Sequence, residues 1–300
     1  MTLANDQDPR LKVQGGTFIV SFGGGLTSYE ALRRTIAAHG RENTVSLFAD
    51  MGQVRDEEGR VVCGEDDDLF RFMEEVERLL DFKITRLKHP DYTDIWDVFF
   101  KVRLMGNTQF DPCSERMKRG VIADHLKQHH TAVEIPADFF RPTRPADVLV
   151  TGLDWTEPDR VTDYRNAVMP WQSWFPLCEE PLLTKADIAE GLLREGIEPP
   201  SLYEQGFSHN NCGGFCVKMG HSQAFRLWKN RPWVYFHHAG KEQQFRQFIG
   251  KDVAILRDRR NKETLPLTLL ELAARFKAGY VPAKSQNEGC GGRCMTPVPA

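Results

Sequence analysis

The sequence lacks any run of about 18 apolar residues, which is the length that a membrane-spanning helix needs. It also lacks a strong excess of either charge, because 39 basic and 42 acidic residues leave a net charge of −3. That balance argues against a general binder of polyanions. Residues 1–14 are polar and contain no apolar signal core. We therefore expect a cytoplasmic chain with no membrane partner.

Two common nucleotide-binding motifs are missing as well. No Gly-Lys-Ser/Thr follows a glycine-rich loop, which excludes a Walker loop. A dinucleotide fingerprint needs a third glycine where Ser28 stands, although Gly23 and Gly25 fit its first two positions. Asp50 lies at about the right distance along the chain for a ribose contact, so a Rossmann dinucleotide site stays open as an alternative.

What the sequence does contain is a glycine loop between an apolar run and a helical pattern. Residues 17–21 form the apolar run, and three consecutive glycines occupy residues 23–25. Thr27 and Glu30 have the spacing of a capping box, which predicts a helix start. Glycines let the backbone turn sharply and expose its N–H groups, and a helix start adds unpaired donors and a positive dipole end. This arrangement predicts a seat for phosphate.

Short apolar runs separated by helical patterns predict the fold class. The runs cover residues 17–21, 45–49, 83–87 and 147–151, and the clearest helical pattern covers residues 69–80. Strands that alternate with helices favour an α/β fold, with a mostly parallel sheet and helices on both faces. Ligands bind such a sheet at the carboxyl ends of its strands, so we expect the glycine loop, Asp50 and the segment after Thr151 to meet there.

The pattern changes towards the C-terminal end of the chain. The alternation of strands fades after about residue 180, Thr184 and Asp187 have capping-box spacing, and prolines at residues 199–200 mark a break. We therefore divide the chain into a polar tail (1–14), a nucleotide-binding domain (15–200) and a mainly helical, cysteine-containing C-terminal appendage (201–300).

A Cys-Gly-Gly-x-Cys motif occurs twice, with its thiols at Cys212 and Cys216 and at Cys290 and Cys294. Each pair can present two thiolates from one tight turn, and four thiolates complete a [4Fe–4S] cluster or a tetrahedral Zn²⁺ site. The spacing of three residues is less common in zinc ribbons and favours iron–sulfur, while inert buried thiols stay open as an alternative. His209 and His221, which flank the first pair, are candidate replacement ligands, although each is more simply a surface or hydrogen-bonded histidine.

Two further segments are candidates for the ligand edge of the sheet. Glu157 and Arg160 follow the fourth apolar run, and Arg160 could hold a phosphate or sulfate bidentately, although a surface ion pair is the simpler interpretation. Cys113 stands at the start of a helical pattern and could face the nucleotide, or could be a plain buried thiol. Cys63 and Cys178 look like ordinary cysteines.

Together these segments resemble the adenine-nucleotide alpha-hydrolase superfamily, specifically the phosphoadenosine phosphosulfate (PAPS) reductase-like branch of the PP-loop ATP pyrophosphatases. The resemblance covers about residues 15–220 and rests on the loop of residues 21–28, on Asp50, on Cys113 with Lys118, on residues 152–160 and on residues 206–212. The family's loop reads Ser-Gly-Gly-Lys-Asp-Ser, whereas residues 23–28 read Gly-Gly-Gly-Leu-Thr-Ser, without the lysine and the aspartate.

The resemblance implies an enzyme that binds ATP with Mg²⁺, adenylates a substrate and releases pyrophosphate, with sulfur transfer as the favoured second half. Glu157 and Arg160 would border the substrate or the pyrophosphate, and the four cysteines of the repeated motif would bind the cluster. The nucleotide would contact Ser21, Gly23, Gly24, Gly25, Thr27, Ser28, Asp50 and Gly152.

Two other functions stay open. The first is a thiol-dependent reductase of a sulfonucleotide, PAPS or adenosine phosphosulfate (APS), with Cys290 or Cys294 as the nucleophile. The second is a non-catalytic nucleotide sensor with a structural zinc, which the missing lysine and aspartate of the loop suggest. A tRNA base, DNA and a small metabolite all fit as acceptors, and a homodimer is the default assembly.

Overall fold

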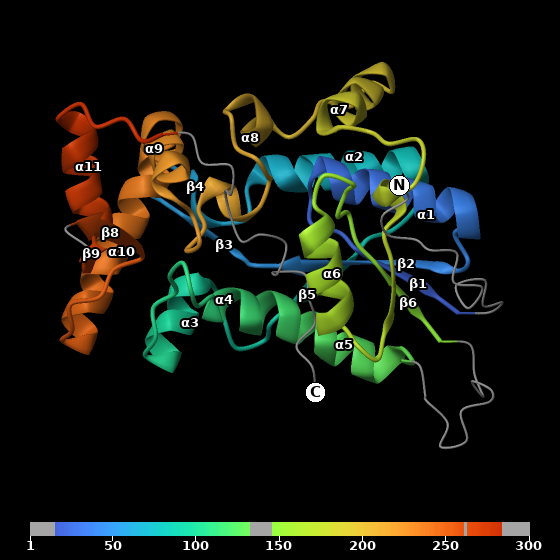
Figure 1. Cartoon of the computed structure of the whole chain (residues 1–300), viewed down its shortest axis with the longest axis horizontal. Coiled ribbons are helices and arrows are strands. Elements are labelled where there is room, and N and C mark those ends of the chain that lie inside the picture. The colour runs from blue at the N-terminus through green and yellow to red at the C-terminus, as the bar shows by residue number, and fades with distance from the viewer. Residues whose placement is uncertain (1–15, 133–145, 261–262, 284–300) are drawn as a thin grey trace.

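The computed structural model describes residues 16–132, 146–260 and 263–283. Its centre is a five-stranded, all-parallel sheet in the order β5-β2-β1-β6-β7, with helices packed against it (Figure 1). The strands are β1 (Phe18–Ser21), β2 (Thr44–Asp50), β5 (Thr85–Lys88), β6 (Val148–Val150) and β7 (Gln172–Trp174). The α/β fold expected from the sequence is confirmed, and β7 is a strand that the pattern did not predict.

The two faces of the sheet bury alternate residues of each strand. Phe18 and Val20 of β1 pack into a core with helices of one face, whereas Ile19 packs into a core with helices of the other. The first face carries α1 (Leu26–His39), α2 (Asp67–Leu80) and α7 (Lys185–Arg194), and the second carries α5 (Val121–His129) and α6 (Pro158–Ala167). Successive side chains of a strand point to opposite faces, so β1 and β6, which are covered on both sides, are buried along their whole length, whereas β5 at the edge of the sheet is mostly exposed.

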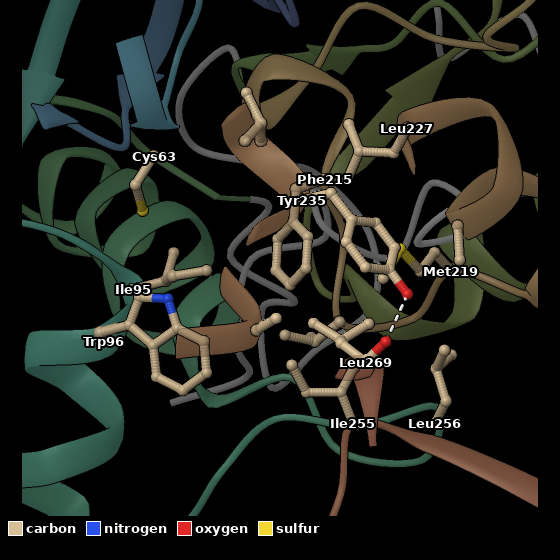
Figure 2. Close-up of a cluster of buried hydrophobic side chains, with 14 of the residues drawn as sticks. Cys63, Ile95, Trp96, Phe215, Met219, Leu227, Tyr235, Ile255, Leu256 and Leu269 are labelled. Carbon is tan, nitrogen blue, oxygen red and sulfur yellow. Dashed lines mark hydrogen bonds between the residues drawn. The ribbon is translucent and has the colours of Figure 1, made fainter. Parts of the chain in front are cut away.

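The remaining elements gather around a third core, which combines side chains from residues 51–117 with side chains from residues 202–276. In Figure 2, Trp96, Phe215, Tyr235 and Leu269 lie in this core, where the Tyr235 hydroxyl donates to the Leu269 carbonyl at 2.7 Å. No helix within the described ranges has both the length and the apolarity of a membrane span. The elements around this core, together with η3 beside β7, are β3 (Gln53–Arg55), β4 (Val61–Gly64), α3 (Ile95–Val102), α4 (Pro112–Ser114), the π-helix η2 (Glu115–Gly120), η3 (Pro176–Cys178), α8 (Ser201–Glu204), η4 (Cys212–Gly214), α9 (His221–Asn230), α10 (Pro232–Ile249), β8 (Leu256–Arg260), β9 (Glu263–Leu267) and α11 (Leu269–Lys277).

The helix after the glycine loop begins in a different way from the one that the sequence suggests. The capping box expected at Thr27 and Glu30 is wrong, because Gly25 is the N-cap and the Ser28 hydroxyl accepts its N–H at 3.2 Å. Glu30 is buried and accepts instead from Arg34 Nε at 2.7 Å. Glu30 therefore forms ion pairs within the helix, with Arg33 and Arg34, and Ser28 takes over the local capping role.

Glu242 joins α10 to the segments on either side of the β8–β9 hairpin. Its carboxylate is buried and accepts from the N–H groups of Ile255 at 2.9 Å and Leu269 at 2.7 Å. Burial raises the pKa of Glu242 from its usual 4.5 to about 7. The folded chain therefore holds this proton more tightly than the unfolded chain. The resulting stabilisation is fully present below pH 4.5 and is lost as the pH rises towards 7.

We expect Glu242→Gln to flatten the pH dependence of folding. The difference between 4.5 and about 7 corresponds to roughly 3 kcal/mol. The free energy of unfolding of the wild type, relative to that of the variant, should fall by about this amount between the two pH values. Urea denaturation on either side of this interval measures the change, and Glu190→Gln on the exposed surface of α7 is the control. Parallel pH profiles for the wild type and E242Q would contradict this assignment.

Candidate functional site

The order of the strands reverses between β1 and β6. The chain moves outward from β1 through β2 to β5, and then returns to place β6 on the other side of β1. In open parallel sheets, ligands bind in the crevice outside this point. Gly152, just after β6, lies against the first turn of α1, because a Cβ on Gly152 would come within 2.7 Å of the carbonyl carbon of Thr27. The glycine loop and the segment after Thr151 therefore meet at this edge.

Two side chains from a distant segment hold the glycine loop. The Tyr203 hydroxyl accepts the N–H of Leu26 at 3.3 Å, and the Asn210 amide donates to the carbonyl of Gly24 at 2.8 Å. Gly24 has a positive φ of 73°, which only glycine adopts readily. A Cβ on Gly25 would come within 2.6 Å of the Tyr203 hydroxyl, so Tyr203 also requires a glycine there.

Other main-chain groups of the loop remain available. The N–H groups of Gly23, Gly24, Thr27 and Ser28 donate to no group in the part of the chain that the structure describes. Unpaired amides at a helix start, with the positive end of the helix dipole behind them, are suited to an anion. The loop therefore keeps four donors for a ligand, while Tyr203 occupies the amide of Leu26.

The carboxylates at this edge already have partners. Asp50 ends β2 next to the loop, and Asp154 follows β6. Each accepts the main-chain N–H two residues further on, at 2.7 Å and 2.9 Å respectively. Glu157 forms an ion pair with Arg160. These contacts shape the loops that follow β2 and β6, and they use part of each carboxylate's capacity to bind a ligand.

Three cationic side chains from different elements approach the same edge. Arg160 lies in the first turn of α6, Lys185 begins α7 and Lys118 belongs to η2. All three influence the ionisation of His209, which places them around that imidazole. Burial lowers the pKa values of Arg160 and Lys185, and the nearby Asp154 partly opposes this effect. Arg160 also pairs with Glu157 and Lys118 with Glu65, so only part of this positive charge is available to an anionic ligand.

His209 stands among these cations as a neutral group. Its Nδ1 accepts the N–H of Asn211 at 3.4 Å, which assigns the proton to Nε2. Nε2 is buried and has no partner among the described residues. Burial, together with Lys118, Lys185 and Arg160, lowers the pKa of His209 to about 4, so the ring is neutral near pH 7. His209 therefore offers a hydrogen-bond donor to an anion without adding a charge.

The Cys-Gly-Gly-Phe-Cys turn packs onto the strand that carries Cys63. The N–H of Cys212 donates to Glu65 Oε2 at 2.7 Å. A Cβ on Gly213 would lie 3.2 Å from the carbonyl oxygen of Gly64. Cys63 immediately precedes Gly64, and Figure 2 shows Cys63 at the margin of the third core. The structure thus brings Cys63, for which the sequence suggested no role, close to the first cysteine pair.

Cys113 joins the same group of thiols. Burial raises the pKa of Cys113, and the thiols of Cys216 and Cys212 raise it further. Burial likewise raises the pKa of Cys212 to about 12, and the thiols of Cys212 and Cys113 add to the effect of burial on Cys63. Such thiols are protonated and poorly nucleophilic unless a metal ion displaces the proton.

Lys118 links the cationic side chains to these thiols. Its Nζ lies 3.3 Å from Glu65 Oε1, and both side chains are buried. Burial alone would lower the pKa of Lys118, but Cys212 and Glu65 raise it above its usual value. A permanent positive charge therefore lies beside the thiols.

The structure brings together only some of the site residues that the sequence predicts. The loop residues, Gly152 and Arg160 lie at one edge of the sheet, as expected, whereas Cys290 and Cys294 lie outside the described residues. Within the described ranges, no three His, Cys, Asp or Glu side chains are arranged to hold a single metal ion. The pattern gave no site role to Lys185, Asn210 or Tyr203. A signal for Lys185 was its place at the start of a capped helix.

No protein-family model matches the sequence, and no curated protein is similar to it at a significant level. The structure itself brings unpaired main-chain amides and three cationic side chains to the reversal point of an α/β sheet, next to a group of thiols.

Proposed function

We propose that the protein is a PP-loop enzyme of the PAPS reductase-like branch, which binds ATP and adenylates an acceptor for sulfur transfer. The observation that carries this proposal is the convergence of unpaired loop amides, three cations and a group of thiols at one edge of the sheet. Amides and cations suit the phosphates of ATP, and thiols suit a metal centre beside them. The free cysteines fit a reducing cytoplasm.

ATP fits the residues at this edge. The amides of Gly23, Gly24, Thr27 and Ser28 can bond phosphate oxygens without the lysine that the family's loop carries. Lys118, Arg160 and Lys185 supply the missing positive charge from other segments. Mg²⁺ would be held mainly by the phosphates, because the carboxylates nearby are partly engaged and Mg²⁺ needs few protein ligands.

The side chains have separate tasks in the proposed reaction. Negative charge develops on pyrophosphate as it leaves, and preorganised cations and donors stabilise such charge most effectively. Arg160 and Lys185 would neutralise this charge, and His209 would donate to it from Nε2. Asp50, at the end of the neighbouring strand, would lie near the ribose or the adenine.

The thiols of Cys63, Cys113, Cys212 and Cys216 fit a [4Fe–4S] cluster. Such a cluster binds one thiolate on each iron, and these four neighbouring thiols supply that number of ligands. When bound, the cluster would supply electrons or sulfur to the acceptor. Lys118 would balance the charge of the thiolates. Cys290 and Cys294 remain the alternative second pair, and Zn²⁺ the alternative metal.

We expect Lys185→Met to weaken the binding of ATP about tenfold or more, because the loss of a charge-assisted hydrogen bond costs roughly 1.5–3 kcal/mol. The affinity for adenosine should change little, since adenosine lacks phosphates. Calorimetric titration with both ligands measures the difference, and Lys229→Met on the exposed surface of α9 is the control. Equal affinities of the wild type and K185M for ATP would argue against this location of the phosphates.

The sulfonucleotide reductase is the second candidate, because the same cations suit the phosphosulfate group of PAPS. Tighter binding of PAPS than of ATP, with release of sulfite, would favour it. Binding of ATP without release of pyrophosphate in the presence of any acceptor would instead favour a nucleotide sensor with a structural zinc.

A further inference from the structure

A hollow lies beside the β8–β9 hairpin. Its volume is about 610 Å³, which falls within the range of pockets that hold small ligands. All six of its lining residues belong to α9, to β8 and β9 or to the loop before Cys113, and none belongs to the parallel sheet. The lining consists of Thr108, Gln109, His221, Arg257, Arg259 and Thr264.

Arg257 and Arg259 give the hollow its positive charge. They share one face of β8, because alternate residues of a strand point the same way, and both are exposed. Asp258 between them points to the other face and pairs with Arg275 at 2.9 Å. Within the described chain, neither Arg257 nor Arg259 has an acidic partner. The two guanidinium groups start roughly 7 Å apart along the strand, and can bond successive phosphates of a polymer.

Aromatic and polar groups stand next to these arginines. His221 lies between the Tyr280 hydroxyl, 3.3 Å from Nδ1, and the Arg257 carbonyl, 3.2 Å from Nε2. The Tyr280 ring also stacks on Phe276 with an interplanar angle of 3°, yet 40% of its surface remains exposed. Phe110, which follows Gln109, is 57% exposed. Exposed rings beside arginines are the combination that binds single-stranded nucleic acids, by stacking on bases and bonding phosphates.

The hollow is also joined along the chain to the thiols. Gln109 comes four residues before Cys113, and His221 comes five residues after Cys216. Because an extended chain spans at most about 3.6 Å per residue, both walls lie within roughly 18 Å of a cysteine. A flexible polymer held at the hairpin can therefore reach the candidate site.

We propose that this hollow binds the phosphodiester backbone of a single-stranded nucleic acid, which is the acceptor of the proposed reaction. The role as acceptor rests on the proposed function, whereas the binding itself is independent of it. Exposed rings favour an unpaired strand over a duplex, because duplex bases are already stacked on each other.

The test measures the affinity of the full chain for fluorescein-labelled single-stranded RNA and DNA of mixed sequence, by anisotropy at several salt concentrations. Arg257→Glu with Arg259→Glu should weaken binding about tenfold or more. Arg257→Gln with Arg259→Gln should lower the slope of log K against log salt by about 1.4, since each phosphate contact on a single strand contributes about 0.7. The matched control is Arg78→Glu with Arg194→Glu, at exposed positions of α2 and α7.

Three results would overturn the inference. The first is that the wild type binds neither RNA nor DNA. The second is that the variants of Arg257 and Arg259 bind as tightly as the control variant. The third is that a mononucleotide at millimolar concentration displaces the polymer completely, which would show a pocket for a small ligand. Titration with ATP in parallel separates this inference from the proposed function. If the wild type does not bind ATP, only the proposed function is contradicted. Retained binding of ATP by the variants of Arg257 and Arg259 shows that these variants are folded.

Discussion

Cys212→Ser is expected to remove most of the iron or zinc that the protein holds after anaerobic purification. The thiol of Cys212 influences those of both Cys63 and Cys113, and Cys216 influences it in turn, so it stands at the centre of the group. Even the loss of a residue that only supports a metal ligand lowers affinity about 10–100-fold, and the loss of a ligand should cost at least that. Elemental analysis and the absorption spectrum of the purified protein measure the result.

The matched control is Cys178→Ser. Its thiol is half-buried in another core, with the Leu153 carbonyl as its recorded partner at 3.9 Å, and the variant should keep its full metal content. Cys113→Ser should behave like C212S. Retention of metal in C113S, together with its loss in Cys290→Ser, would show that the second Cys-Gly-Gly-x-Cys motif completes the site. Full metal content in C212S would end the metal hypothesis for this turn.

Gly152→Ala is expected to weaken the binding of ATP at least tenfold. The new Cβ would lie within 2.7 Å of the Thr27 carbonyl carbon and within 2.9 Å of the Ser28 nitrogen. Both are main-chain atoms, so the start of α1 has to move, and its amides move with it. A tenfold change in affinity corresponds to about 1.4 kcal/mol, which a small displacement of several hydrogen bonds can exceed. Calorimetric titration with ATP measures the loss.

Gly191→Ala is the control for this variant, since nothing lies within 4 Å of the position of its Cβ. Gly191 is inside α7, where alanine favours the helix over glycine by up to about 1 kcal/mol, so G191A should be slightly more stable and bind ATP normally. Circular dichroism verifies that both variants are folded. If G152A is folded and binds ATP with the affinity of the wild type, the nucleotide does not bind at the reversal point of the sheet.

Much of the fold follows from signals that are local in the sequence. The buried strands appear as apolar runs, and the capping box of Thr184 and Asp187 is confirmed at the start of α7. Strand β7, with the sequence Gln-Ser-Trp, is too short and polar to give a signal. At Thr27 the spacing is present, yet the helix begins earlier because Ser28 bonds to Gly25. Local competition of this kind is decided by contacts that spacing does not record.

Only part of the candidate site can be predicted from local patterns in the sequence. The glycine loop, Gly152 and Arg160 follow strands, so the rule for parallel sheets predicts their edge. Tyr203 reaches Leu26 from a segment that has no strand pattern and folds back over the sheet. The cysteine motif likewise identifies only cysteines that are close together in the sequence. Cys63 and Cys113 approach the first pair through the packing of β4 and α4, which no spacing could reveal.

The residues that brace the glycine loop have a consequence for regulation. Asn210 donates to the glycine loop, and Cys212 follows it after a single residue, so one short stretch of backbone joins the loop amides to the thiols. Any coupling through this stretch between the proposed nucleotide and metal sites would act equally in both directions, because thermodynamic linkage is reciprocal.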